Sequence, residues 1–259
     1  YDVIHFVDGE HSGLLTAMHK IKSQFSLSSK IVATYHQPCS VMKEIVKEPS
    51  YLNGFDAIQL MSPCQFDFFE RSVGNTKLKL APHGLAPELM GDELPVHIVG
   101  IGDDRKIPGL SEKVNGRRIL LTVGNWLRDF EMLLSTAAIM QQHDDIVFVV
   151  VSKGLELDIS QMSNVVLLNE GISDNQLHHL YLQASMLFLP LKDGAANNAV
   201  LEAMAHGLPI TTTELPSTRY YTQGNAVFCN QTPESYRDGI YDMFERISVV
   251  DNLSLMKET

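Results

Sequence analysis

The chain has 259 residues, of which 44% are hydrophobic, so it is long enough to bury one large core or two medium ones. Its 20 lysines and arginines are outnumbered by 31 acidic residues. The resulting net charge of -11 argues against a nucleic-acid-binding protein, which needs clustered positive charge. No segment approaches the roughly 20 consecutive apolar residues of a membrane span, which leaves only peripheral membrane contact open. We therefore expect a cytoplasmic protein.

The cysteine and histidine spacings do not predict a metal centre. Cys39, Cys64 and Cys229 lie far apart without a Cys-x-x-Cys pair, which favours free, buried thiols over a disulfide framework. His178 and His179 are neighbours and would diverge on a helix, whereas a helical metal pair needs a spacing of about four residues. We expect neither a metal nor another cofactor.

The first part of the chain alternates apolar strands with helical segments. Short apolar runs occupy residues 2–7, 30–36, 57–62 and 77–82. Alternation of this kind predicts βαβ units and a parallel sheet. Because a buried strand begins immediately after Tyr1, we expect further residues to precede it.

A second lobe is predicted after an irregular connection. Residues 86–118 are rich in glycine, proline and mixed charges, and six further apolar runs follow them: RILLTVG, DIVFVVVS, NVVLLN, SMLFLPL, LPITTT and NAVFCN. Apolar residues at helical spacing between these runs predict a second doubly wound sheet, in which ligands bind at the carboxyl ends of the strands. The predicted divisions are a first lobe at 1–85, the connection at 86–118, a second lobe at 119–235 and a terminal packing helix at 236–259.

Residues 193–213, DGAANNAVLEAMAHGLPITTT, carry the clearest signal of a binding site. Asn197 or Asn198 is a favourable N-cap for a short helix, and the small side chains around it would let a phosphate approach the first backbone N–H groups. Glu202 lies one turn further on, where it can reach a hydroxyl of the same ligand. An ordinary strand-to-helix turn with a surface glutamate is the alternative.

Two other strand ends carry residues suited to a diphosphate. Gly124 follows an apolar strand, and Arg128 offers a planar fork of donors shortly afterwards. Lys153 and Gly154 repeat the arrangement after the next strand. A solvated arginine and an ordinary turn are the alternatives at these positions.

Polar residues also follow two strands of the first lobe. His36 ends one strand, and a histidine in a crevice can bind a sugar hydroxyl or transfer a proton near neutral pH. Asp8, Glu10 and His11 cluster after another strand and suit a hydroxyl-rich acceptor. A structural histidine and simple turn chemistry at Asp8 explain the same residues equally.

Taken together, these segments resemble the retaining, nucleotide-sugar-dependent glycosyltransferases of the two-Rossmann GT-B fold, in the group 1 family that includes sucrose synthases and bacterial mannosyltransferases. The similarity rests on NEGISDNQLHHLYLQASMLFLPL and LEAMAHGLPITTT, preceded in order by DVIHF, ATYHQP, MSPCQFDFF and APHGL. It covers roughly residues 2–230. The resemblance implies an α/β protein with two Rossmann-like lobes, the first truncated at its N-terminus.

The resemblance also implies roles for individual residues. Glu202 matches the second glutamate of the E-x7-E motif, which holds the donor ribose, and His36 matches the histidine that contacts the transferred sugar. Gly124 matches the glycine of the diphosphate-binding turn, with Arg128 in place of the usual basic pair. The positions that the family uses beside the diphosphate and the base are Asn197, Asn198, Ala199, Gly171 and Ile172.

Two positions depart from the family pattern. Gly194 stands where the first glutamate of the motif is expected, with Asp193 one residue earlier, so that either the loop is shifted by one residue and Asp193 substitutes or the contact to the sugar has changed. Asn125 stands where an arginine is common. The resemblance implies sugar transfer with retention to a hydroxyl acceptor, without a metal and with Arg128, His36 and Glu202 as the catalytic set. A nucleotide-sugar-binding module of the same fold that has lost turnover is the alternative, as is another two-Rossmann enzyme such as an epimerase. A dehydrogenase is disfavoured because no G-x-G-x-x-G follows a strand.

Overall fold

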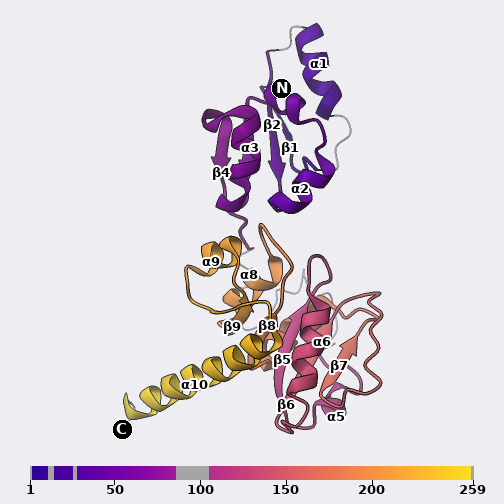
Figure 1. The fold of residues 1–259 in the computed structure, drawn as a ribbon, viewed down its shortest axis with the longest axis vertical. Coiled ribbons are helices and arrows are strands. Elements are labelled where there is room, and N and C mark those ends of the chain that lie inside the picture. The colour runs from indigo at the N-terminus through magenta and orange to yellow at the C-terminus, as the bar shows by residue number, and fades with distance from the viewer. Residues whose placement is uncertain (1, 11–14, 26–27, 86–104, 258–259) are drawn as a thin grey trace. The chain divides into compact units, whose positions relative to one another are not determined.

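The polypeptide divides into two compact units (Figure 1). The structure is a computed structural model that describes residues 2–10, 15–25, 28–85 and 105–257. The first unit comprises Tyr1–Gly84, Asp193–Asn197 and Leu215–Tyr221, and the second comprises Leu85–Lys192, Asn198–Glu214 and Thr222–Thr259.

The first unit is built on a four-stranded parallel sheet with the order β1-β2-β3-β4. Its strands are β1 (Val3–Phe6), β2 (Lys30–Tyr35), β3 (Ala57–Leu60) and β4 (Leu78–Leu80). Its helices are α1 (Leu15–Gln24), α2 (Cys39–Ile45) and α3 (Phe66–Val73), with 3-10 turns at η1 (Pro49–Gly54), η2 (Pro63–Gln65) and η3 (Asn75–Lys77). Buried side chains of the strands and helices form one core, in which Tyr35 packs on Phe69.

The second unit is built on a six-stranded parallel sheet with the order β10-β9-β8-β5-β6-β7. Its strands are β5 (Arg118–Val123), β6 (Ile146–Val151), β7 (Val165–Leu168), β8 (Met186–Leu189), β9 (Ile210–Thr213) and β10 (Val227–Cys229). The chain runs outward from β5 to β7 and then returns to the other side of β5, so the strand order reverses between β5 and β8. Such a reversal opens a crevice at the carboxyl ends of the two strands, where ligands bind in this class of sheet.

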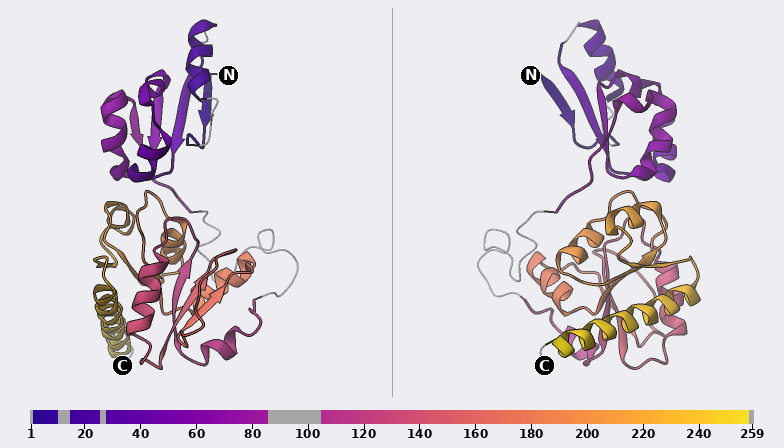
Figure 2. Two further views of the ribbon diagram at one scale, coloured as in Figure 1. Left: turned by 45° about the vertical axis from the view of Figure 1, so that its right-hand side comes forward. Right: turned by 90° about the vertical axis from the view of Figure 1, so that its left-hand side faces the viewer.

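Helices cover the sheet of the second unit. They are α5 (Leu110–Val114), α6 (Phe130–Ile139), α7 (Asp174–Gln183), α8 (Asn198–Ala205) and α10 (Pro233–Lys257). Helix α9 (Pro216–Thr222), except for its last residue, belongs to the first unit. Every residue of β6 is buried, as expected for a parallel strand that is covered on both faces. Helix α10 packs against α6, β9 and β10, and Figure 2 shows it running across the outside of this unit.

A glycine sets how closely α10 approaches the sheet. A Cβ atom at Gly239 would lie 2.5 Å from Sγ of Cys229 and 3.1 Å from Cγ1 of Val227. These distances are shorter than carbon and sulfur contacts allow, so only glycine fits here without a shift of the helix.

The ten predicted strands are all present among the described residues, each inside its predicted apolar run. Residues 86–104 of the predicted connection lie outside the described part of the chain, and the remainder contains α5. The terminal helix begins at Pro233 rather than at 236, because Oγ1 of Thr232 accepts a hydrogen bond from the backbone N–H of Ser235 and caps the first turn. No helix among the described residues is long and apolar enough to cross a membrane.

The three cysteines are free thiols, as predicted, but the expectation that all are buried is wrong. Only Cys229, on the edge strand β10 where α10 packs, is buried, whereas Cys39 and Cys64 are half-buried. Cys39 is the first residue of α2, and Cys64 lies in η2, so both follow shortly after the ends of β2 and β3.

Candidate functional site

The loops after β5 and β8 are joined at the point where the strand order reverses. Arg128 and Leu191 form an antiparallel bridge, and the backbone N–H of Asp129 donates to the carbonyl of Pro190 at 2.9 Å. The N–H of Lys192 donates to the carbonyl of Leu127 at 2.9 Å. These bonds hold residues 124–129 beside 190–192, at the carboxyl ends of two adjacent strands. The predicted diphosphate turn therefore lies at the crevice of the second sheet.

Gly124 and Arg128 form a compact unit within this crevice. Gly124 has φ of 87°, and a Cβ atom there would lie 2.9 Å from Nη2 of Arg128. The guanidinium folds back along the loop, since Nε donates to the carbonyl of Val123 at 2.8 Å and Nη1 donates to the carbonyl of Trp126 at 3.0 Å. Leu127, between them, has φ of 57°, a left-handed conformation that is uncommon for a residue with a side chain. The left-handed backbone at Leu127 costs conformational energy, and it accompanies the placement of the guanidinium beside Gly124.

Burial and neighbouring charges shift the pKa of Arg128 in opposite directions. Burial lowers the pKa of Arg128 to about 10, and the nearby Tyr181 and Glu202 counteract this shift. The guanidinium remains a cation at neutral pH, in surroundings where its field is less screened than in water. It can therefore stabilise a negative charge that develops in the crevice.

Glu202 is oriented by a buried tyrosine. The hydroxyl of Tyr181, on α7, donates a hydrogen bond of 2.7 Å to Oε2 of Glu202, on α8. Burial raises the pKa of Glu202, and the Tyr181 hydrogen bond partly opposes that shift. Arg128 lowers the same pKa, so the three side chains act on one another electrostatically.

Two histidines, His206 and His178, lie next to Glu202 and Tyr181. Nδ1 of His206 lies 2.6 Å from the backbone oxygen of Glu202, and because a carbonyl only accepts, this nitrogen carries the hydrogen. Nε2 of His206 lies 2.8 Å from Nδ1 of His178. The His206 ring stacks on the Tyr181 ring with 4.9 Å between the centroids. His179 does not diverge from His178 as the spacing predicts, because the two rings meet edge to face with 5.5 Å between centroids. Nδ1 of His179 lies 3.0 Å from the backbone oxygen of Asn175. Sequence reasoning missed Tyr181 and His206, although His206 lies four residues after Glu202, just beyond the end of α8, where its backbone N–H donates to the Glu202 carbonyl.

The predicted anion-binding residues surround the start of α8. The helix begins at Asn198, directly after Asn197, and Ala199 is buried, in agreement with a small residue where the backbone is closely approached. Asp193 and Gly194 lie in the preceding segment, where Oδ1 of Asp193 accepts the N–H of Gly194 at 2.7 Å. The Asp193 carboxylate is thus bonded to the backbone of the next residue.

Lys153 and Gly171, which are predicted to bind the nucleotide-sugar donor, meet at the ends of β6 and β7. Gly171 has φ of 89°, and a Cβ atom there would lie 3.4 Å from Cδ of Lys153, so the lysine stem covers this glycine. The N–H of Gly154 donates to the carbonyl of Asn169 at 2.8 Å, which joins the two strand ends. Ile172 is half-buried and precedes Ser173, the N-cap of α7.

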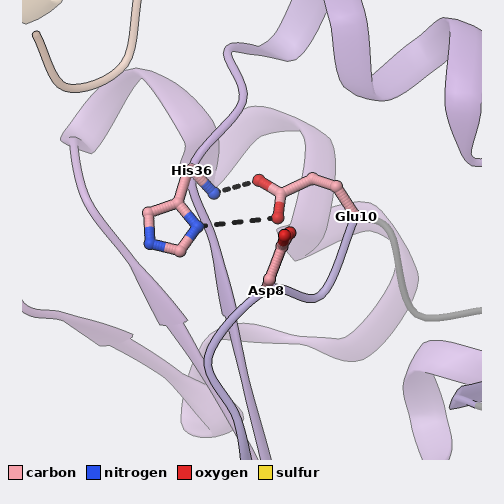
Figure 3. Close-up of side chains that lie close together, drawn as sticks. All are labelled: Asp8, Glu10 and His36. Atoms are coloured by element: carbon pink, nitrogen blue, oxygen red, sulfur yellow. Dashed lines mark hydrogen bonds and ion pairs between the residues drawn. The ribbon is translucent and has the colours of Figure 1, made fainter.

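The polar cluster predicted in the first unit brings together Asp8, Glu10 and His36 (Figure 3). Oε1 of Glu10 accepts the backbone N–H groups of His36 and, at 2.6 Å, of Gln37. Oε2 of Glu10 lies 3.6 Å from Nδ1 of His36. Interaction with the Glu10 carboxylate raises the pKa of His36, against a smaller lowering by burial. His36 thus joins Asp8 and Glu10, two of the three residues of the predicted cluster, and the third, His11, lies outside the described residues.

Residues 117–246 match the family described as Glycosyl transferases group 1. No curated protein sequence matches the chain. Among solved structures, the UDP-forming α,α-trehalose-phosphate synthase from Burkholderia vietnamiensis is similar, with a TM-score of 0.70 and 13% identity over 93% of this chain and 63% of that chain. The sucrose-phosphate synthase from Thermosynechococcus elongatus has a TM-score of 0.65 and 15% identity over 95% of this chain and 65% of that chain.

A third similar structure is the N-terminal domain of trehalose-6-phosphate phosphatase from Candida albicans, with a TM-score of 0.71 and 15% identity over 93% of this chain and 62% of that chain. The chain thus spans less than two thirds of the length of these three structures. At such low identity, the likeness shows a common fold and carries no assignment of substrates.

Proposed function

This chain belongs to the group 1 glycosyl transferases, and we propose that it moves a sugar from a nucleotide-diphosphate donor to a hydroxyl acceptor. Its two parallel sheets, each with its own helices, form the two Rossmann-like lobes predicted for a GT-B fold. The observation that carries the proposal is the meeting of Gly124, Arg128, Tyr181 and Glu202 where the strand order of the second sheet reverses. A cation and a carboxylate at this place suit the phosphates and the ribose of one nucleotide.

The donor would be held by backbone and side chain together. Glu202 would accept a ribose hydroxyl, with Tyr181 fixing the rotation of its carboxylate. The diphosphate would lie between the start of α8, at Asn197, Asn198 and Ala199, and the turn at Gly124. Lys153, Gly171 and Ile172 would flank the base, because they lie on the next strand ends of the same sheet.

Transfer would proceed with retention of configuration and without a metal. The bond between the anomeric carbon and the β-phosphate oxygen breaks, its electron pair stays on the phosphate, and the acceptor hydroxyl attacks from the same face. The acceptor proton passes to the departing phosphate oxygen. Arg128 stabilises the charge that develops on the leaving group, which is where a fixed cation lowers the barrier most.

The first unit would supply the groups around the transferred sugar and the acceptor. His36 would donate to a hydroxyl of the donor sugar, and Asp8 and Glu10 would lie on the acceptor side with His11. Asp193 and Gly194 would meet the donor sugar in place of the usual glutamate. We further propose a cytoplasmic location, in keeping with a soluble nucleotide-sugar donor.

The alternative is a nucleotide-sugar-binding module that no longer turns over. Gly194 in place of the first motif glutamate and Asn125 in place of an arginine favour it, since both changes remove contacts to the donor. The Asp193 carboxylate, which accepts its neighbour's N–H, is a shorter substitute for that glutamate.

The two functions are separated by assaying the full-length protein with UDP-, GDP- and ADP-sugars. Calorimetry with the free nucleoside diphosphates measures binding, and chromatography measures donor hydrolysis and transfer to a panel of sugar acceptors. Transfer with the α- or β-anomer of the donor preserved in the product, read by proton NMR, supports the enzyme. Tight binding with neither hydrolysis nor transfer supports the module, and no binding of any nucleoside diphosphate contradicts both.

A further inference from the structure

The cluster of Asp8, Glu10 and His36 has the composition of a metal site, a role that the sequence spacing does not suggest. Each residue offers one ligand atom, and these atoms all lie within 4.8 Å of one another. The residues come from the carboxyl ends of β1 and β2, which are adjacent parallel strands. Figure 3 shows the carboxylates of Asp8 and Glu10 and the imidazole of His36 directed toward a common point.

One oxygen of Glu10 is buried without a hydrogen bond. The Glu10 side chain is only 1% exposed, and Oε2 has no hydrogen-bond partner among the residues that the structure describes. A buried carboxylate oxygen in this state costs free energy unless a positive charge compensates it. Oε2 is turned toward Nδ1 of His36, so the compensating positive charge is either a proton on that nitrogen or a metal ion bound between the two atoms.

The other Glu10 oxygen fixes the carboxylate in place. Oε1 accepts two backbone N–H groups, those of His36 and Gln37, at the end of β2. Gly9 packs so closely on β2 that an added Cβ would lie 2.8 Å from the Tyr35 ring, which anchors the loop on the other side. Metal-binding carboxylates are commonly oriented in this way, with one oxygen bonded to the protein and the other left for the ion.

The distances suit a first-row transition metal. Two ligand atoms 3.6 Å apart, each about 2.1 Å from a shared ion, subtend about 120° at that ion, close to the tetrahedral or trigonal arrangement of zinc sites. All three ligand atoms lie within 4.8 Å of one another, and the exposed Asp8 carboxylate is the ligand that would adjust to reach the ion. One imidazole and two carboxylates select zinc-like ions over Mg²⁺ and Ca²⁺, which prefer oxygen ligands alone.

We propose that Asp8, Glu10 and His36 bind one zinc-like divalent cation with a fourth coordination position open to water or a ligand hydroxyl. His36 is 39% exposed, which gives the ion a route from solvent. Sites with three protein ligands and an open position characteristically bind a water or a substrate oxygen. The proposal concerns binding in the first unit alone and does not depend on the sugar transfer proposed above.

Titration calorimetry of the full-length, chelator-treated protein with Zn²⁺ tests the site, with Mg²⁺ as the comparison ion. We expect one Zn²⁺ per chain and no heat from Mg²⁺. Glu10→Gln keeps the acceptor for the two backbone N–H groups but removes the negative charge, and we expect it to weaken Zn²⁺ affinity more than about tenfold. Glu44→Gln, an exposed carboxylate on α2 of the same unit, is the matched control and should leave the affinity unchanged.

Binding to the half-buried thiols of Cys39 and Cys64 is excluded with Co²⁺ in place of Zn²⁺. The proposed nitrogen and oxygen ligands give visible d–d absorption without the near-ultraviolet charge-transfer band of a thiolate. If Glu10→Gln loses its circular dichroism, Asp8→Asn, at an exposed ligand, replaces it with the same expected loss of affinity. Absence of Zn²⁺ binding, a thiolate band, or equal affinity in the variants and the Glu44→Gln control overturns the proposal.

Discussion

The hydroxyl of Tyr181 donates a hydrogen bond of 2.7 Å to the carboxylate of Glu202, and it does so from a side chain that is only 2% exposed. The two residues lie on different helices, α7 and α8, so the bond fixes the rotation of the carboxylate as well as joining the helices. Arg128 interacts electrostatically with both. The arrangement presents a carboxylate and a cation together, which is what a ribose diphosphate requires.

Tyr181→Phe removes this hydrogen bond while keeping the ring that stacks on His206. We expect donor affinity to fall about tenfold, equivalent to about 1.4 kcal/mol, because the Glu202 carboxylate loses its fixed orientation. Trp126, the single tryptophan of the chain, is 60% exposed in the neighbouring loop, so its fluorescence can report the titration. Tyr241→Phe, which removes an exposed hydroxyl bonded to His143, is the control; equal losses in the two variants would contradict the assigned role.

Glu202→Gln keeps the size of the side chain and removes its charge. We expect donor affinity to fall more than tenfold at pH 7, since hydrogen bonds to charged groups contribute about 1.5–3 kcal/mol. Burial raises the pKa of Glu202, so the carboxylate of the wild type takes up its proton at a higher pH than an exposed glutamate does. Donor affinity of the wild type should therefore fall as the pH drops toward that raised pKa, and the affinity of Glu202→Gln should stay flat. Parallel pH profiles in calorimetry would rule the carboxylate out as the ligand.

Gly124→Ala introduces a Cβ atom 2.9 Å from the Arg128 guanidinium, at a φ of 87°. We expect a loss of about 1–2 kcal/mol in the free energy of unfolding from the backbone conformation, with a further loss of donor affinity because Arg128 is displaced. Gly116→Ala is a close control, since Gly116 has φ of 73° but nothing within 4 Å of an added Cβ. Chemical denaturation and donor titration measure both effects. Gly116→Ala should lower the free energy of unfolding by a similar amount and leave the donor affinity unchanged.

Asp56 ties β2 and α1 to the start of β3 in the first unit. Burial would raise its pKa, but hydrogen bonds from Lys22, the backbone N–H of Ile31 and Lys30 outweigh burial and lower it to about 2. Because the folded pKa is below the unfolded one, this stabilisation is complete above about pH 4 and disappears as the pH falls through about 2.

Asp56→Asn should therefore reduce the free energy of unfolding by about 1 kcal/mol at pH 7, a value that allows for solvent screening of a partly exposed group. The difference from the wild type should shrink to zero as the pH falls toward 2. Urea denaturation between pH 2 and pH 7 measures it, with the exposed Asp144→Asn as the control. A difference that persists unchanged to low pH would show that the loss comes from packing and not from the charge.

Much of the donor site could be predicted from local sequence because its residues come directly after strands. Gly124, Lys153 and Gly171 each follow an apolar run, and parallel strands bring all carboxyl ends to one edge of the sheet. The structure joins the β5 and β8 loops by backbone hydrogen bonds between residues far apart in the sequence, which no single segment predicts. The sequence also does not predict that the Arg128 side chain folds back beside Gly124, because this conformation accompanies the left-handed backbone of Leu127.

The sequence by itself determined the alternation of strands and helices, because apolar periodicity follows from which faces must be buried. It also determined the composition of the loops, because glycine and small residues mark where backbone must bend or be approached. Only the tertiary structure decided which side chains face one another. Tyr181 meets Glu202, and Glu10 meets His36, across elements that are distant along the chain, and their pKa values follow from burial and neighbouring charge, which exist only once those elements have packed.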